Sequence, residues 1–339
     1  MFDMIKSTPA KICLLVTALV TFVYSMNFML FADCYVTGGA DGCFTILSNE
    51  TSLGMNSWGN GGPETAFNGT MMFGIFISTM IILNEGAKGM WRTMIPVMIG
   101  LVTMTAVIWI NWTDTIDSSE TPKFVVPIVT LIYIAAYFLL RSEDEVDEGL
   151  SDFKPGLNIQ DKPALLALLV LVVMGAFYCL RAIVTPESTI EAYEYGALAE
   201  GLGQPSAVTV AVGGSLFLVY LLWMVLTIME GAKGKWAIIH PGIFWLMAVV
   251  ISNYVWFLDN LDLSDTLARP VTDQSTMDGI TGPVAMSLLL LAYYRLRSEG
   301  IEDGMTFNGE SMSANDFNIF AIMWAIGLGI IFTANMMMG

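Results

Sequence analysis

The sequence predicts an all-α integral membrane protein with nine transmembrane helices, arranged as two parallel four-helix repeats followed by one extra C-terminal helix. Three observations support this prediction. The 339-residue chain is 55% hydrophobic and only 13% charged, whereas soluble domains carry about 25% charged residues. Nine stretches meet or approach the roughly 20 apolar residues that a membrane span needs. Finally, one motif and its surroundings occur twice.

The apolar stretches define the predicted spans. They are Ala10–Phe31, Gly62–Asn84, Trp91–Ile110, Phe124–Leu140, Ala164–Leu180, Ala207–Met229, Trp236–Phe257, Thr281–Tyr294 and Phe317–Met336. The first stretch follows two lysines, as in a secretion signal, but it is too long and lacks a small-residue cleavage site, so we expect it to be retained. The second and eighth are the weakest, but they align with the sixth and fourth, which are clear.

The repeated motif organises the chain. Glu85–Trp91 reads EGAKGMW, and Glu230–Trp236 reads EGAKGKW. At the same offset Pro96, Asp114 and Asp117 fall on Pro241, Asp259 and Asp262. A second block, Pro127–Glu143, falls on Pro283–Glu299. Because four spans is an even number, both copies enter the membrane from the same side, which predicts parallel repeats related by an axis along the membrane normal.

These alignments predict four segments. Residues 1–149 form the first four-span repeat, with an outer loop at 33–61, and residues 150–162 form a cytoplasmic linker. Residues 163–305 form the second repeat, and residues 306–339 carry the extra C-terminal span.

The positions of lysine and arginine predict the orientation. Lys88 and Arg92 join spans two and three, and Lys233 and Lys235 join spans six and seven, whereas residues 33–67 carry no positive charge. Positive residues favour cytoplasmic loops. We therefore expect a cytoplasmic N-terminus and an outer C-terminus in a plasma or inner membrane.

The outer loop at 33–61 contains two cysteines, Cys34 and Cys43. Both are predicted to lie on the oxidising side of the membrane, where disulfides persist. We therefore expect a disulfide that closes this loop and restrains it.

The net charge of −17 limits the range of partners. The chain has 31 acidic and 14 basic residues, which argues against nucleic acid and against a polybasic contact with anionic lipid. The acidity fits either a salt-adapted surface or an acidic vestibule that concentrates cations. The expected partners are the lipid bilayer and either other membrane subunits or further copies of the chain.

Six carboxylates are candidate path or ion-attracting residues. Glu85 and Glu230 end spans two and six, where a carboxylate is costly unless it is solvated or paired. They either pair with the adjacent Lys88 and Lys233 or line the inner mouth of a path. The other four follow spans three and seven on the outer side, at a spacing that places them on one helical face; they are Asp114, Asp117, Asp259 and Asp262. These four either attract cations or form a solvated acidic face.

Asn27, Asn253 and His240 are candidate polar residues within the predicted spans. Asn27 and Asn253 can join helices by hydrogen bonds. His240 is the single histidine and precedes a proline, a position that favours a structural hydrogen bond over a proton relay. All three also remain candidates for a polar path.

Several absences bear on the function. One histidine is too few for a bis-histidine haem or a multi-histidine metal site. The sequence has no Walker A loop, no GxSxG and no HExxH. We therefore expect no cofactor, no metal site and no enzymatic activity.

Two function classes stay open. The first is a channel or transporter for a small cation or small polar solute, with its path at the interface of the two repeats. The alternative is a non-catalytic structural or accessory subunit of a larger membrane complex. Symmetric acidic residues favour the first class, and the small number of ionisable groups in mid-membrane favours the second.

Overall fold

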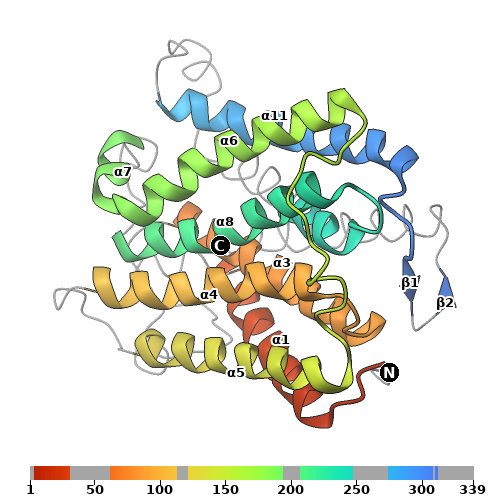
Figure 1. The fold of residues 1–339 in the computed structure, drawn as a ribbon. Coiled ribbons are helices and arrows are strands. Elements are labelled where there is room, and N and C mark those ends of the chain that lie inside the picture. The colour runs from red at the N-terminus through yellow and green to blue at the C-terminus, as the bar shows by residue number, and fades with distance from the viewer. Residues whose placement is uncertain are drawn as a thin grey trace.

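Long apolar helices run side by side through the computed structural model (Figure 1). The structure describes residues 4–30, 62–112, 121–193, 207–246, 274–307 and 310–311. The long helices are α1 (Thr8–Leu30), α3 (Gly62–Glu85), α4 (Trp91–Asn111), α5 (Thr121–Glu143), α6 (Lys162–Val184), α8 (Ala207–Glu230) and α11 (Gln274–Leu296). The shorter elements are α7 (Pro186–Tyr193), the helix Trp236–Leu246, the 3-10 turn η2 (Arg297–Glu299), and a small hairpin of β1 (Thr306–Phe307) and β2 (Glu310–Ser311).

Six of these helices are long and apolar enough to cross a membrane: α1, α3, α4, α5, α6 and α8. They coincide with the first six predicted spans and differ from them by a few residues at the ends. A helix satisfies its own backbone hydrogen bonds, which is what hydrocarbon requires. The chain is therefore confirmed as a helical protein with the features of a polytopic membrane protein.

The later predicted spans are covered only in part. The helix α11 contains the predicted eighth span, but it is not among the six helices that are apolar enough to cross. Of the seventh span, the structure describes a shorter apolar helix, Trp236–Leu246. The predicted ninth span, Phe317–Met336, lies outside the described residues. The sequence did not predict α7, which begins two residues after α6 ends.

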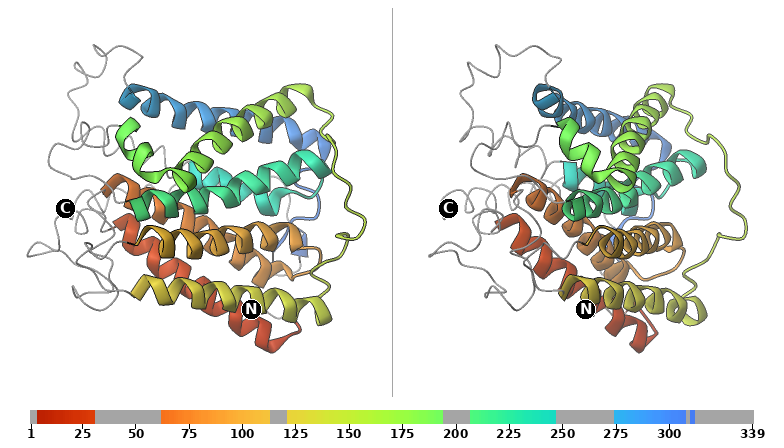
Figure 2. Two further views of the ribbon diagram at one scale, coloured as in Figure 1. Left: turned by 60° about the vertical axis from the view of Figure 1, so that its left-hand side comes forward. Right: turned by 90° about the vertical axis from the view of Figure 1, so that its left-hand side faces the viewer.

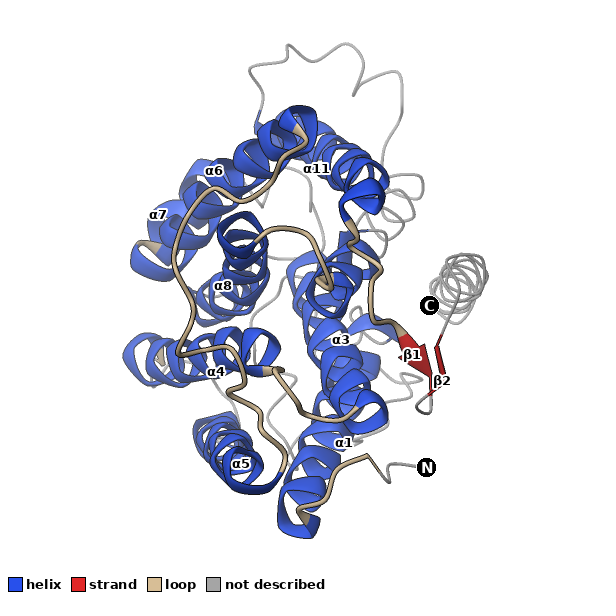
Figure 3. Cartoon of the chain, turned by 45° about the vertical axis from the view of Figure 1, so that its right-hand side comes forward, coloured by secondary structure: helices blue, strands red, loops and turns tan. Residues whose placement is uncertain are grey.

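The helices α3 and α8 form the centre of the bundle. In each, 72% of the apolar stretch is buried, against 39% in α1 and 33% in α5 and α6. The helix α3 contacts α1, and α8 contacts both α4 and α6; Figure 3, which looks nearly along the helices, shows α8 between them.

A close approach joins the two central helices. A Cβ atom on Gly74 would lie 1.8 Å from the Tyr220 hydroxyl oxygen, so only glycine fits there. That hydroxyl donates a hydrogen bond to the Met71 carbonyl at 2.8 Å, and the Asn68 amide donates to the Thr209 carbonyl at 3.0 Å. Hydrogen bonds of this kind hold helices together where water is absent.

The outer faces of α1, α5 and α6 expose large apolar side chains. They include Ile12, Leu19, Phe22, Phe124, Leu131, Phe138, Leu166, Val173 and Phe177. In water such faces would favour association with other apolar surfaces. On helices of this length they fit contact with lipid.

Two tight turns, Gly86–Met90 and Gly231–Lys235, lie at the same end of the bundle, which we call the turn end. Figure 2 shows this end beside the long connection between α5 and α6. Gly86 and Gly231 have φ angles of 95° and 94°, and Gly89 and Gly234 have φ angles of 68° and 67°. Glycine adopts this region at no steric cost, which explains both glycines of the motif.

The segments after α5 and after α11 make matching backbone hydrogen bonds with these turns. Gly89 and Trp91 donate to the carbonyls of Glu145 and Val146 at 3.1 and 3.0 Å, and Gly234 and Trp236 donate to those of Gly300 and Ile301 at 2.9 and 3.1 Å. The first turn is therefore held by the segment that follows α5, and the second by the segment that follows α11.

The first helix of each half is capped in a matching way. The Asp144 carboxylate accepts hydrogen bonds from the backbone N–H groups of Lys6 and Ser7 at 2.7 and 3.1 Å, just before α1. The Glu299 carboxylate accepts from those of Gln160 and Asp161, just before α6. Helix N-termini carry N–H groups with no partner inside the helix, and the dipole there favours an anion.

Candidate functional site

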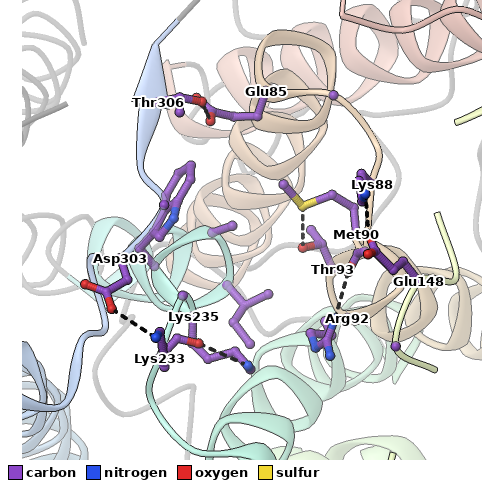
Figure 4. A pocket seen from close by; sticks show the side chains of 18 of the residues that line it. Glu85, Lys88, Met90, Arg92, Thr93, Glu148, Lys233, Lys235, Asp303 and Thr306 are labelled. Carbon is purple, nitrogen blue, oxygen red and sulfur yellow. Dashed lines mark hydrogen bonds and ion pairs between the residues drawn. The ribbon is translucent and has the colours of Figure 1, made fainter. Parts of the chain in front are cut away.

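A pocket of about 670 Å³ opens at the turn end between the two repeated turns. Figure 4 shows side chains from both turns directed around it. Residues of the first turn that line it include Glu85, Lys88 and Met90, and those of the second include Lys233 and Lys235. Two copies of one motif that lie far apart in the sequence thus form one site.

The first turn supplies a carboxylate, Glu85, that has no cationic partner among the described residues. The Glu85 side chain accepts hydrogen bonds from the Asn84 amide at 3.1 Å and from the Thr306 hydroxyl in β1. Within the described part of the chain, no ion pair joins Glu85 to a lysine or arginine. These two donors, and the Thr306 backbone that also bonds to this carboxylate, are neutral.

The second turn supplies a carboxylate between two cations. The Arg92 guanidinium donates to both oxygens of Glu230, through Nε and through Nη2 at 2.6 Å, and Lys235 Nζ lies 3.2 Å from Glu230 Oε2. The three side chains are 25%, 12% and 11% exposed for Arg92, Glu230 and Lys235, respectively. This cluster is largely shielded from solvent and carries two positive charges against one negative charge.

The surplus positive charge affects Lys235. Burial lowers the pKa of its ammonium group below the ordinary value, Glu230 partly offsets that effect, and Arg92 adds to it. Burial disfavours the charged form, and a like charge acts in the same direction. An additional anion near Lys235 and Arg92 would stabilise the protonated lysine.

The adjacent lysines of the motif have other partners. Lys88 Nζ lies 3.3 Å from carboxylate oxygens of both Glu145 and Glu148, and these two groups raise the pKa of Lys88. Lys233 Nζ lies 3.8 Å from Asp303. The Glu85–Lys88 and Glu230–Lys233 pairs considered from the sequence are therefore wrong; each motif lysine instead pairs with the segment after the last helix of its half.

Two further candidate residues lie away from the pocket lining. Asn27 is fully buried in α1. His240 is buried, with its Nε2 atom 2.9 Å from the Tyr293 hydroxyl, which donates in turn to Glu302 at 2.5 Å. This chain of hydrogen bonds joins the helix Trp236–Leu246 to α11 and agrees with a structural role for the histidine.

The remaining candidates lie outside the described residues and stay predictions. They are the outer acidic residues Asp114, Asp117, Asp259 and Asp262, the amide Asn253, and the cysteines Cys34 and Cys43. Cys13 and Cys179, which are described, are free thiols.

Sequence reasoning missed three residues of the site, namely Arg92, Lys235 and Thr306. One signal for Lys235 was present, since the two copies of the motif differ at this position, where the first has Met90. Arg92 has Ala237 as its counterpart. Thr306 carries no sequence signal, because its contact with Glu85 depends on where β1 lies.

No group of three or more histidine, cysteine, aspartate or glutamate side chains is placed to hold a metal ion in the part of the chain that the structure describes. Comparisons with protein-family models, with curated proteins and with solved structures find no match to this chain. The function is therefore argued from the pocket itself.

Proposed function

We propose that the protein is a channel or transporter for a small polar solute, and that the pocket between the two turns is the inner vestibule of its path. One observation carries this proposal. Glu85 ends a predicted membrane span, lines an open pocket and has only neutral partners among the described residues. A carboxylate at such a position is costly, and contact with a solute would offset the cost.

The proposed architecture has nine spans, as two parallel four-helix copies and one further helix. The matching φ angles of the turn glycines, the matching backbone hydrogen bonds and the matching helix caps support a duplication. The proposed orientation places the turn end in the cytoplasm, because Lys88, Arg92, Lys233 and Lys235 gather there.

The packing of the central helices favours a carrier over an open channel. Deeper in the bundle, Tyr220 and Asn68 fill the space between α3 and α8. A continuous path along this interface would require the two helices to separate. A transporter meets that requirement by alternating between conformations around a binding site.

Flux from liposomes that contain the purified protein tests this function. Sodium, potassium, calcium, methylammonium, urea and small zwitterions would each be loaded in turn. We expect saturable flux of at least one solute, and we expect it to fall at least tenfold in E85Q. The matched control is E148Q, since Glu148 lies at the mouth of the pocket and is already paired with Lys88. Folded wild-type protein that passes none of these solutes would exclude the proposal.

The second candidate is an accessory subunit of a larger membrane complex. The apolar faces of α1, α5 and α6 favour it, because they could contact a partner instead of lipid. Extraction in a mild detergent tests this candidate. A stoichiometric partner would support it, and an isolated monomer or homo-oligomer would contradict it.

A further inference from the structure

We propose that the pocket at the turn end binds a small zwitterion, with its cationic end at Glu85 and its anionic end at Arg92 and Lys235. The ligand class that we have in mind is an amino acid or a betaine. The inference deepens the proposed function, because it names the solute class for the same vestibule.

Glu85 provides the site for the cationic end. Each carboxylate oxygen has two acceptor positions, and the Asn84 amide and the Thr306 hydroxyl each occupy one, on different oxygens. The Thr306 backbone also donates to this carboxylate, and one acceptor position remains for an ammonium group. Because both protein partners are neutral, a ligand cation would supply the first counter-charge among the contacts that the structure describes.

Arg92 and Lys235 provide the site for the anionic end. Arg92 uses Nε and Nη2 on Glu230 and Nη1 on the Gly89 carbonyl at 3.1 Å, which leaves one N–H on each terminal nitrogen. Lys235 contacts Glu230 and the Lys233 carbonyl, so a third N–H remains. Arg92 and Lys235 share one carboxylate, Glu230, in a largely buried cluster. This cluster therefore favours the binding of a second anion.

The other described charges around the pocket lie in exposed ion pairs, with one net negative charge beside Lys88. Lys88 is paired with Glu145 and Glu148, and Lys233 is paired with Asp303. These side chains are more than half exposed, so their field is screened by solvent. Among the less exposed charges that the structure describes around the pocket, the unbalanced ones are the negative charge of Glu85 and the surplus positive charge beside Glu230.

The arrangement of the unbalanced charges favours a ligand that carries both a positive and a negative charge. Figure 4 shows Glu85 and Thr306 on the opposite side of the pocket from Arg92 and Lys235. A simple cation would meet Glu85 but also face the surplus positive charge, and a simple anion would face Glu85. The volume of about 670 Å³ lies within the usual range for small-molecule pockets, about 300–1,000 Å³.

Apolar side chains between the charged groups fit the rest of such a ligand. The lining includes Met4, Met90, Trp236, Ala237 and Ile238. A methylene chain or the methyl groups of a betaine would contact these residues. Methionine adapts to ligands of different shape. We therefore expect the pocket to bind several zwitterions and not a single compound.

Equilibrium binding to the purified full-length protein tests the inference independently of flux. Calorimetric titrations would use glycine, glycine betaine and γ-aminobutyrate as zwitterions, methylammonium and choline as simple cations, and acetate as a simple anion. We expect at least one zwitterion to bind at least tenfold more tightly than every singly charged ligand. A singly charged ligand that binds as tightly as the best zwitterion would overturn the inference.

Variants at the two ends sharpen this test. We expect E85Q and K235M each to weaken zwitterion binding at least tenfold, and K235R, which keeps the charge, to restore most of the affinity of K235M. The matched controls E145Q and R141M alter ion-paired residues that do not line the pocket and are expected to change affinity less than twofold. Equal losses in K235M and R141M would contradict the assignment of the anionic end.

The two experiments separate failure of the ligand class from failure of the transport function. Zwitterion binding without flux of any solute would exclude transport and retain the ligand class. Flux of a cation or of urea by protein that binds no zwitterion would overturn the ligand class and retain transport.

Discussion

The two EGAKG turns have one backbone and two electrostatic environments. Their first glycines share a φ angle within one degree, and each turn is held by the same pair of backbone hydrogen bonds. Yet Glu85 contacts neutral donors, whereas Glu230 lies between Arg92 and Lys235. The difference involves three positions of the repeat: Asn84 corresponds to Met229, Met90 to Lys235, and Arg92 to Ala237. Backbone geometry is common to both turns, so a role specific to this pocket has to come from the side chains that differ.

The largest expected effect separates the two glutamates. E230Q leaves Arg92 and Lys235 without their shared counter-charge, and loss of one partner in a buried cluster costs about 3–5 kcal/mol. Since Arg92 is partly exposed, we expect a loss of about 2–4 kcal/mol in the free energy of unfolding. E85Q removes no ion pair that the structure describes and is expected to cost less than about 1 kcal/mol. Denaturant unfolding in detergent measures both. Equal losses would show that the two turns are electrostatically alike.

The next effect tests the shared backbone. Alanine at Gly86 or Gly231 places a Cβ at positive φ, which costs about 1–2 kcal/mol. A Cβ on Gly231 would also lie 3.0 Å from the Asn158 carbonyl oxygen, whereas one on Gly86 would lie 3.6 Å from Met4 Cβ. We therefore expect G231A to be less stable than G86A. The control is G304A, where φ is 80° and nothing lies within 4 Å of the added atom. A loss in G304A as large as that in G231A would show that contact with Asn158 adds nothing.

A third substitution makes the first turn resemble the second. M90K introduces an ammonium group at the position that corresponds to Lys235, within the same pocket as Glu85. We expect the new cation to pair with Glu85 and to weaken zwitterion binding at least tenfold, because the cationic end of the ligand loses its partner. The melting temperature in detergent should change little, and M90L provides the uncharged control. Unchanged affinity in M90K would argue against Glu85 as the site of the cationic end.

The smallest effect concerns the exposed lysines. The side chains of Lys88 and Lys233 are 64% and 80% exposed, and surface ion pairs contribute little to stability. We expect K88M and K233M to unfold at the wild-type denaturant midpoint, within error, at both low salt and 1 M salt. A clear and salt-dependent loss in either variant would mean that the motif lysines stabilise the turns through their charge.

The sequence predicted the helices better than it predicted the site. Six spans were located to within a few residues because apolar length is a local property of the chain. The Arg92–Glu230 pair joins α4 to the end of α8, and no local pattern reports how those two helices pack. Thr306 reaches Glu85 from a strand after the last described helix. The short helix α7 was missed because it has only eight residues and a polar composition.

The capping of α1 by Asp144 has a consequence for the order of assembly. Ribosomes deliver Lys6 and Ser7 early, whereas the carboxylate that receives their N–H groups arrives only after α5 has been made. Asp144 therefore binds the N–H groups before α1 only after α5 has been made, and Glu299 binds those before α6 with a similar delay. In each case the carboxylate follows a later helix, α5 for Asp144 and α11 for Glu299. In a chain released between these two steps, Asp144 would already bind the N–H groups before α1, but Glu299 would not yet bind those before α6. Cellular quality control would then act on the two groups of helices separately.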